Sequence, residues 1–172
     1  TALLSSKEPR VFGIDCEMVV CEDNPSTLAR ASLVERLPDG GAQILLDEYV
    51  LPPSTVIEYR THISGITEEH LASATKSLRD IQEFIMANIA RDDVLIGHTL
   101  NSDLKALQVC HTRIIDTALL FNVRDLPRWT LSLRDLVLEL FADHPDANSF
   151  QQAGCAHDSV LDAKWAIRIV AA

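Results

Sequence analysis

Two acidic residues stand inside an apolar stretch near the start of the chain. Asp15 and Glu17 interrupt the run VFGIDCEMVVC, residues 11–21. The run predicts a buried β-strand, in which side chains two positions apart point to the same face. Ionised carboxylates in such a place need cations, hydrogen-bond donors or a shifted pKa. The pair could supply half of a Mg²⁺ or Mn²⁺ site, although a lone Asp-x-Glu is more often two acids at an exposed strand end.

A further acid, Asp103, follows a later apolar strand. The segment LIGHTLNSDLKAL, residues 95–107, predicts a short buried strand and then a helix with Asp103 in its first turn. Such strand-to-helix connections are places where α/β folds bind ligands. Taken alone, Asp103 is an ordinary acid at a helix N-terminus, and His98 is better explained as a hydrogen-bonded structural histidine than as a ligand.

The third group is HDSVLDA, residues 157–163, which holds His157 and Asp162 five positions apart. On one continuous helix this spacing would turn the two side chains about 140° away from each other. Both can face one site only if His157 precedes the helix, Asp158 or Ser159 caps it, and Asp162 lies one turn inside. The alternative is an ordinary capped helix with a surface histidine.

The elements that must position these residues follow from the hydrophobic pattern. Three strands come first, and the turn PDGG joins the second to the third. Helices and short strands then alternate, with Ser77 and Ser132 as helix caps. This order indicates an α/β fold with a central mixed five-stranded sheet, three antiparallel strands then parallel strands, flanked by helices. The five strands are expected in RVFGIDCEMVVC, LARASLVERL, AQILLDEYVL, DVLIGH and RIID.

Size and composition are those of a globular protein. The 172 residues suffice for one domain, which we expect at residues 10–172 after a lead-in at residues 1–9. No apolar run approaches the roughly 20 residues of a membrane helix, and no secretory signal pattern opens the chain; we expect no membrane partner. Because the chain begins with Thr1 rather than Met, we expect it to be a piece of a longer protein with flanking domains or protein partners.

Charge and cysteine usage narrow the class further. The net charge of −10 disfavours a sequence-indifferent nucleic-acid coat, which needs Lys and Arg, but clustered metal-binding acids also make a chain negative. Cysteines at positions 16, 21, 110 and 155 follow no disulfide or metal-binding spacing. Reduced thiols are the favoured interpretation.

Together, the three acidic motifs resemble those of the DEDD superfamily of 3′–5′ exonucleases, in its histidine-containing (DEDDh) branch. The segments DCEM, YRTHISGIT, LIGHTLNSDLKAL, IIDTALLF, LSLRDL and HDSVLDA are similar in particular to the Rex-type RNA exonuclease subgroup, over nearly the whole chain. The resemblance implies a ribonuclease H-like fold. It also implies hydrolysis of single-stranded RNA from its 3′ end, with release of nucleoside 5′-monophosphates, in the processing of ribosomal or transfer RNA precursors in the nucleus or nucleolus.

The same resemblance implies roles for five residues. Asp15, Glu17 and Asp162 would bind one of two Mg²⁺ or Mn²⁺ ions, held roughly 3.5–4 Å apart. Asp15 would also bridge to the second ion, which Asp103 would reach directly or through water. His157, neutral near pH 7, would accept the proton of the attacking water.

Three residues are candidates for substrate contacts. Met18 and Leu100 could pack against the terminal base, or they could simply belong to the core. Arg60, in the segment YRTH, could contact the terminal ribose or phosphate, or it could form a surface salt bridge with Glu58 or Glu68. Arg60 and the backbone near Met18 are the candidates for the 2′-hydroxyl contact that RNA preference requires.

The sequence fits other functions less well or leaves them open. A serine hydrolase built on Ser159 lacks the nucleophile-elbow glycines. A catalytically silent RNA-binding domain is disfavoured because all five catalytic positions are filled. A DNA-directed or short-oligonucleotide exonuclease of the same fold stays open, and comparing rates on RNA and DNA would separate the two.

Overall fold

The computed structural model describes residues 8–121, 130–152 and 154–172. Most of the lead-in expected at residues 1–9 therefore lies outside the described residues. The first strand begins at Val11, close to the start of the domain expected at residue 10.

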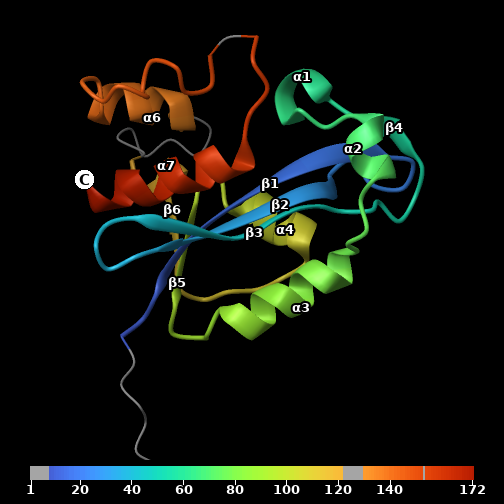
Figure 1. The fold of residues 1–172 in the computed structure, drawn as a ribbon, viewed down its shortest axis with the longest axis horizontal. Coiled ribbons are helices and arrows are strands. Elements are labelled where there is room, and N and C mark those ends of the chain that lie inside the picture. Colours follow the sequence, from blue (N-terminus) through green and yellow to red (C-terminus); the bar gives the residue numbers. More distant parts are fainter. Residues whose placement is uncertain (1–7, 122–129, 153) are drawn as a thin grey trace, which may run out of the picture.

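The central sheet is mixed and contains the five expected strands. Its order is β3-β2-β1-β5-β6, with β1 antiparallel to β2 and parallel to β5, as Figure 1 shows. A sixth strand, β4, pairs with the end of β1; with three residues, it is too short to show an alternating pattern. The strands are β1 (Val11–Cys21), β2 (Thr27–Arg36), β3 (Ala42–Tyr49), β4 (Val56–Glu58), β5 (Val94–Gly97) and β6 (Ile114–Asp116).

The helices begin where the sequence places their caps. The Ser77 side chain accepts a hydrogen bond from the Asp80 N–H, and Asp80 accepts one from the Ser77 N–H; Asp158, one of the two predicted caps, accepts from the first N–H groups of α7. The helices are α1 (Thr61–Ser64), α2 (Glu68–Ala72), α3 (Leu78–Asn88), α4 (Asn101–Leu107), α5 (Thr117–Leu120), α6 (Leu133–Leu140) and α7 (Ser159–Ala171). Within the described ranges, no helix is both long and apolar enough to cross a membrane.

Alternating residues of β1 pack against different helices. Phe12, Ile14 and Cys16 belong to the core that includes residues of α3 and α4. On the opposite face Val34 of β2 packs with Ala163 and other residues of α7. Figure 1 shows α7 and α6 above the sheet and α3 below it. Phe12, Ile14 and Cys16 thus form a conventional core, whereas Gly13 lies on the face that is covered by α7.

A glycine allows α7 to lie close to the sheet. A Cβ atom at Gly13 would stand 2.5 Å from the Ala163 carbonyl oxygen and 2.9 Å from the Ile167 side chain. Real Cβ atoms do not approach backbone oxygens this closely, so the packing requires glycine. The close approach brings the first turns of α7 to the strand that carries Asp15.

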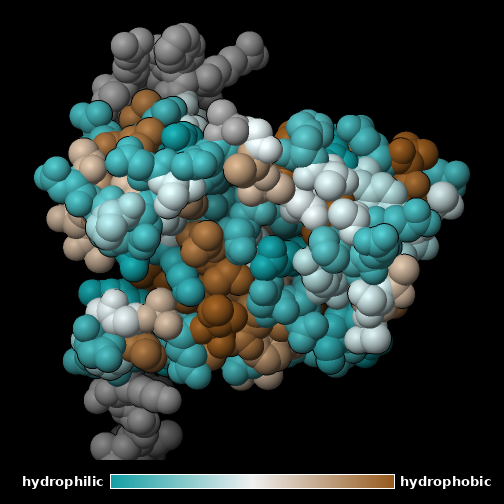
Figure 2. Space-filling view, turned by 45° about the horizontal axis from the view of Figure 1, so that its top comes forward, coloured by the Kyte–Doolittle hydropathy of each residue, from teal (hydrophilic) through white to brown (hydrophobic). Residues whose placement is uncertain are grey.

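The face shown in Figure 2 is largely hydrophilic, with a central hydrophobic band. Among the described residues, the most exposed large apolar side chains are Met86, Leu119 and Ile57, which lie on three different elements. Scattered apolar side chains of this kind are ordinary on protein surfaces.

Candidate active site

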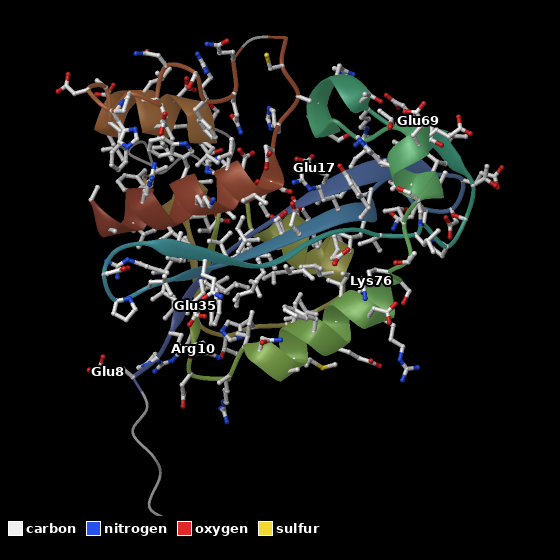
Figure 3. The ribbon with its side chains drawn as sticks, viewed as in Figure 1. Glu8, Arg10, Glu17, Glu35, Glu69 and Lys76 are labelled. Carbon is white, nitrogen blue, oxygen red and sulfur yellow. The ribbon has the colours of Figure 1, made fainter. Side chains whose placement is uncertain are left out.

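The first two acids lie on the face of β1 that is covered by α7. Asp15 pairs with Ser32 in β2, and the Ser32 hydroxyl lies 2.7 Å from the Ser159 hydroxyl of α7. Figure 3 shows Glu17 on β1 beside the N-terminal end of α7. Glu17 is buried and Asp15 is partly exposed. The Asp-x-Glu pair is therefore not at an exposed strand end.

The third acid reaches β1 from α4. The Cys16 backbone N–H donates to Asp103 Oδ1 at 2.9 Å. This N–H is free because β5 pairs with β1 only from Val11 to Gly13, so Cys16 lies beyond the end of that pairing. Asp103 is buried, so its carboxylate is fixed at the backbone between Asp15 and Glu17.

Asp116, at the end of β6, holds the turn that leads into α4. Its Oδ1 accepts the Thr99 N–H at 2.8 Å and its Oδ2 accepts the Leu100 N–H at 2.9 Å. Thr99 has a left-handed backbone, with φ of 54°, a conformation that costs energy for a β-branched residue. Sequence reasoning did not single out Asp116; its place at the end of a short strand was the available signal.

The structure brings His157 and Asp162 together in the way that their spacing requires. His157 precedes α7, and its backbone N–H donates to the Ile63 carbonyl at 2.8 Å. Its Nδ1 atom lies 3.6 Å from Asp162 Oδ2, and Asp162 is buried one turn inside the helix. The Gln151 side chain donates to the same Asp162 Oδ2 at 2.7 Å, a contact that the sequence did not indicate.

The four carboxylates of Asp15, Glu17, Asp103 and Asp162, here called the acid cluster, all have raised pKa values, and burial is the largest cause for each. Burial, followed by repulsion from Asp162, raises the pKa of Glu17 to about 8, against the pull of Arg30. Burial raises the pKa of Asp103 and of Asp162 to about 7 each. Burial and then the charges of the other three acids raise the pKa of Asp15 well above its ordinary value. The cluster therefore lacks positive charge.

Arg30 is a cation beside the acid cluster that sequence reasoning missed. It lies opposite Glu17 in the β1–β2 register. Its guanidinium donates to both carboxylate oxygens of Asp47 in β3, at 2.7 and 2.9 Å. It also lies 3.5 Å from Asp158 Oδ1 at the start of α7. An arginine amid the apolar residues of a strand was the only signal of this network.

The remaining predicted residues have different surroundings. Leu100 is completely buried in the core below the sheet, so the core interpretation holds for it and it presents no surface to a nucleotide. Met18 is partly buried and packs against the same core. Arg60 is partly exposed and has a left-handed backbone with φ of 52°; within the part of the chain that the structure describes, it makes no salt bridge to Glu58 or Glu68.

The two histidines near the cluster differ in their contacts. His98 Nδ1 lies 2.9 Å from the Thr117 hydroxyl, which agrees with the structural role expected for it. Burial lowers the pKa of both His98 and His157. A lowered pKa favours the neutral form of the His157 imidazole at pH 7, which is the form able to accept a proton.

The chemistry of the acid cluster fits divalent cations. Its donors are all carboxylate oxygens, which Mg²⁺ and Mn²⁺ prefer. Asp162 Oδ1 is buried and has no hydrogen-bond partner among the described residues, and a cation would satisfy it. In the described residues, no three His, Cys, Asp or Glu side chains already converge at metal-ligand distances, so binding would require side-chain adjustment.

No family model matches the chain, but individual proteins do. Small RNA degrading nuclease 2 from Arabidopsis thaliana is 39% identical over 163 residues, which are 94% of this chain and 34% of that protein. RNA exonuclease 1 from Saccharomyces cerevisiae is 34% identical over 160 residues, which are 92% of this chain and 27% of that protein. The chain thus spans about a third of the first relative and about a quarter of the second.

Solved structures share the fold. The Pan2 catalytic unit of Neurospora crassa aligns with a TM-score of 0.80 and 24% identity, over 98% of this chain and 28% of that one. The pseudoubiquitin hydrolase–RNA exonuclease module of Saccharomyces cerevisiae Pan2, solved with A7 RNA, aligns with a TM-score of 0.77 and 25% identity, over 98% of this chain and 29% of that one. On these relatives and this fold, the chain belongs to the DEDD superfamily of 3′–5′ exonucleases, in the Rex-type RNA exonuclease subgroup of its histidine-containing branch.

Proposed function

We propose that this domain removes nucleoside 5′-monophosphates one at a time from the 3′ end of single-stranded RNA, with Mg²⁺ or Mn²⁺ as cofactor. One observation carries the proposal. Carboxylates from β1, α4 and α7, far apart in sequence, meet in a cluster whose raised pKa values show a deficit of positive charge. The names of the relatives, a small RNA degrading nuclease and an RNA exonuclease, support RNA as the substrate.

Asp15, Glu17, Asp103 and Asp162 would hold two divalent cations. When bound, the cations supply positive charge to the scissile phosphate and lower the pKa of the attacking water. His157 accepts the proton that this water loses, because its imidazole is neutral at pH 7. The water oxygen forms a bond to phosphorus, the bond from phosphorus to the 3′ oxygen of the preceding nucleotide breaks, and that oxygen takes up a proton from solvent water while His157 later returns its proton to solvent. The product is a nucleoside 5′-monophosphate.

Substrate contacts belong to the same proposal. Arg60 carries a fork of donors suited to a phosphate or ribose, and it makes no ion pair within the described part of the chain. The backbone at Met18 follows Glu17 directly and is the second candidate for contact with the terminal ribose. A donor or acceptor at either place could recognise the 2′-hydroxyl and so favour RNA over DNA.

The biological setting is proposed from the family alone. We infer that the protein trims structured RNAs such as ribosomal or transfer RNA precursors in the nucleus, together with domains or partners outside this chain.

The test is the degradation of 5′-labelled single-stranded RNA with Mg²⁺ or Mn²⁺, beside an EDTA control and a DNA strand of the same sequence. We expect a ladder that shortens by single nucleotides, disappears with EDTA, and forms faster on RNA. Asp15→Asn should abolish it, with a loss of at least about 10³-fold, since cation-held charge supplies several kcal/mol to such reactions. Glu83→Gln, which removes an equal charge from the surface of α3, should have no effect. Mid-strand cuts, or degradation that EDTA does not stop, would overturn the proposal.

A further inference from the structure

The one-turn helix α1 lies between the end of β1 and the segment that carries His157. β4, which precedes α1 in the chain, pairs with the end of β1. Just after α1, Ile66 belongs to a buried cluster that also contains Val19 and Cys21 of β1. Both ends of α1 are therefore attached to the strand that contributes two residues to the acid cluster.

Hydrogen bonds within α1 hold it in one conformation. Arg60 precedes it with a left-handed backbone, and the Arg60 carbonyl accepts the N–H groups of Ile63 and Ser64 at 2.8 and 3.0 Å. The buried Ser64 hydroxyl donates to the Tyr59 carbonyl at 2.9 Å and accepts the Ile66 N–H at 3.1 Å. Because one satisfied hydroxyl joins the residues before and after the turn, the turn has little freedom to change its shape.

The end of α1 packs closely against the residues before α7. The His157 N–H donates to the Ile63 carbonyl at 2.8 Å, and Figure 1 shows α1 beside the segment that leads into α7. Gly65, which follows α1, has φ of 68°, and a Cβ atom there would stand 3.3 Å from the Ala156 Cβ. This distance is shorter than ordinary van der Waals contact, so a side chain at position 65 would displace the neighbour of His157 by a few tenths of an ångström.

We propose that α1 is a positioning element of the active site, which sets the place of His157 relative to Arg60, and that Gly65 is the positioning residue that permits this close approach. The carbonyl that holds the His157 backbone is only three residues after Arg60. The proton acceptor and a candidate RNA contact are therefore attached to the same rigid turn, and an RNA end bound by Arg60 would meet His157 at a fixed distance. The inference rests on the proposed exonuclease function and adds Gly65 to its residues.

Gly65 also has the conformation of an ordinary helix end. Its N–H donates to the Thr61 carbonyl at 3.0 Å, and glycine is common in the left-handed position after a helix. The two roles predict different responses to a second substitution. If Gly65 is needed only for its backbone conformation, removing the Ala156 methyl group cannot compensate for a side chain at position 65. If Gly65 is needed for the close approach, it can.

Gly65→Ala and a matched glycine variant therefore test the inference. Gly40, in the turn after β2, has φ of 84°, and a Cβ atom there would meet nothing within 4 Å. Both alanine variants place a side chain on a left-handed backbone, but only Gly65→Ala also creates a contact. A displacement of about 1 Å in a catalytic group costs about 100-fold in rate, so about a third to a half of it should cost about 5- to 10-fold.

We expect this loss in kcat for Gly65→Ala, with KM changed less than about threefold because Arg60 stays in place, and no loss for Gly40→Ala. The double variant Gly65→Ala, Ala156→Gly lacks the methyl group that the new Cβ would meet. Its kcat should return to within about twofold of that of Ala156→Gly alone, since the two substitutions share one contact.

Hydrogen exchange provides a measurement that does not depend on activity. The His157 amide is protected by its bond to the Ile63 carbonyl, and its exchange rate reports how often that bond opens. In the metal-free protein we expect this amide to exchange about 10-fold faster in Gly65→Ala, and at the unaltered rate in Gly40→Ala and in the double variant. Ser64→Ala, which removes the hydroxyl that joins the two ends of the turn, should also speed the exchange and serves if Gly65→Ala does not fold.

The outcomes separate this inference from the function on which it rests. If Gly65→Ala equals Gly40→Ala in both kcat and His157 exchange, α1 has no positioning role. If Gly65→Ala is impaired and Ala156→Gly restores neither quantity, Gly65 is only a helix end and the inference is overturned. If the unaltered protein does not degrade RNA at all, the proposed function fails, and the exchange rates still decide whether the close approach of α1 holds His157 in place.

Discussion

Asp103 Oδ1 accepts a hydrogen bond from the Cys16 backbone N–H at 2.9 Å, at the residue that separates Asp15 from Glu17. A carboxylate from α4 is thereby attached to the strand that carries the other two. The bond exists only because β5 ends its pairing with β1 at Gly13. The topology of the sheet, rather than any local motif, thus assembles three of the four acids.

The acid cluster predicts an unusual pH dependence of stability without metal. The pKa values of Glu17, Asp103 and Asp162 are about 8, 7 and 7, above the values near 4 of unfolded chains. Between these values the native state binds more protons than the unfolded state, so stability is present at low pH and is lost as pH rises through the folded pKa. We expect the melting temperature of chelator-treated protein to fall between pH 7 and pH 8.

Two histidines with lowered pKa values, His98 and His157, shift stability in the opposite sense, but mainly below pH 7. Above it they are neutral in both states. Saturating Mg²⁺ should raise the melting temperature and remove the decline, because a bound cation favours the ionised carboxylates. A melting temperature that is constant or rises from pH 7 to pH 8 without metal would contradict the charge deficit.

Gly13→Ala should damage the site without touching an acid. The added Cβ would stand 2.5 Å from the Ala163 carbonyl oxygen, which forces α7 away from β1 and separates Asp162 from Asp15. Overpacking of this kind costs about 1–3 kcal/mol of stability, and a displacement of about 1 Å in a catalytic group costs about 100-fold in rate. Urea denaturation and the RNA assay measure the two effects.

Gly41→Ala is the matched control, because the nearest atom to its new Cβ is in the Asp39 side chain, at 2.9 Å, in the turn after β2. That side chain can move. If Gly13→Ala retained full activity, the close contact of α7 with β1 would have no part in positioning the site.

Arg30→Gln should loosen the start of α7. The change removes two hydrogen bonds to Asp47 and the contact with Asp158, and the Arg30 side chain is only 15% exposed. Hydrogen bonds to charged groups contribute about 1.5–3 kcal/mol, so we expect a loss of about 2 kcal/mol in the free energy of unfolding. Arg79→Gln breaks an exposed ion pair with Glu83 and should leave the urea midpoint unchanged. Equal midpoints for the two variants would show that the Arg30 network adds nothing.

Periodicity and capping rules were sufficient to predict how the site residues are presented. The period of two in β1 placed Asp15 and Glu17 on one face, and the five-residue spacing of His157 and Asp162 required a cap at Asp158 or Ser159, which Asp158 provides. These are local relationships, which a short segment determines by itself. The five strands of the sheet followed from the same kind of pattern.

The contacts that support the site could not be predicted from the sequence. They join segments that are far apart in the chain, and hydrophobic periodicity describes only one segment at a time. Gln151 reaches Asp162 through a loop with a left-handed residue, and Arg30 meets Asp47 and Asp158 across two strands and a helix. Leu100 was ambiguous because an apolar residue beside a site can face either the core or the ligand. Only the packing against α3 and β1 decides that it belongs to the core.

The central claim is that Asp15, Glu17, Asp103 and Asp162 together hold divalent cations. Crystals of the protein soaked in MnCl₂, with diffraction data collected at the manganese absorption edge, test it most directly. The account predicts anomalous peaks within ligand distance of oxygens from all four carboxylates, with Asp162 Oδ1 among them, and no peak at the cluster in Asp15→Asn crystals. Manganese bound only elsewhere on the protein, in crystals whose acid cluster is open to solvent, would contradict it.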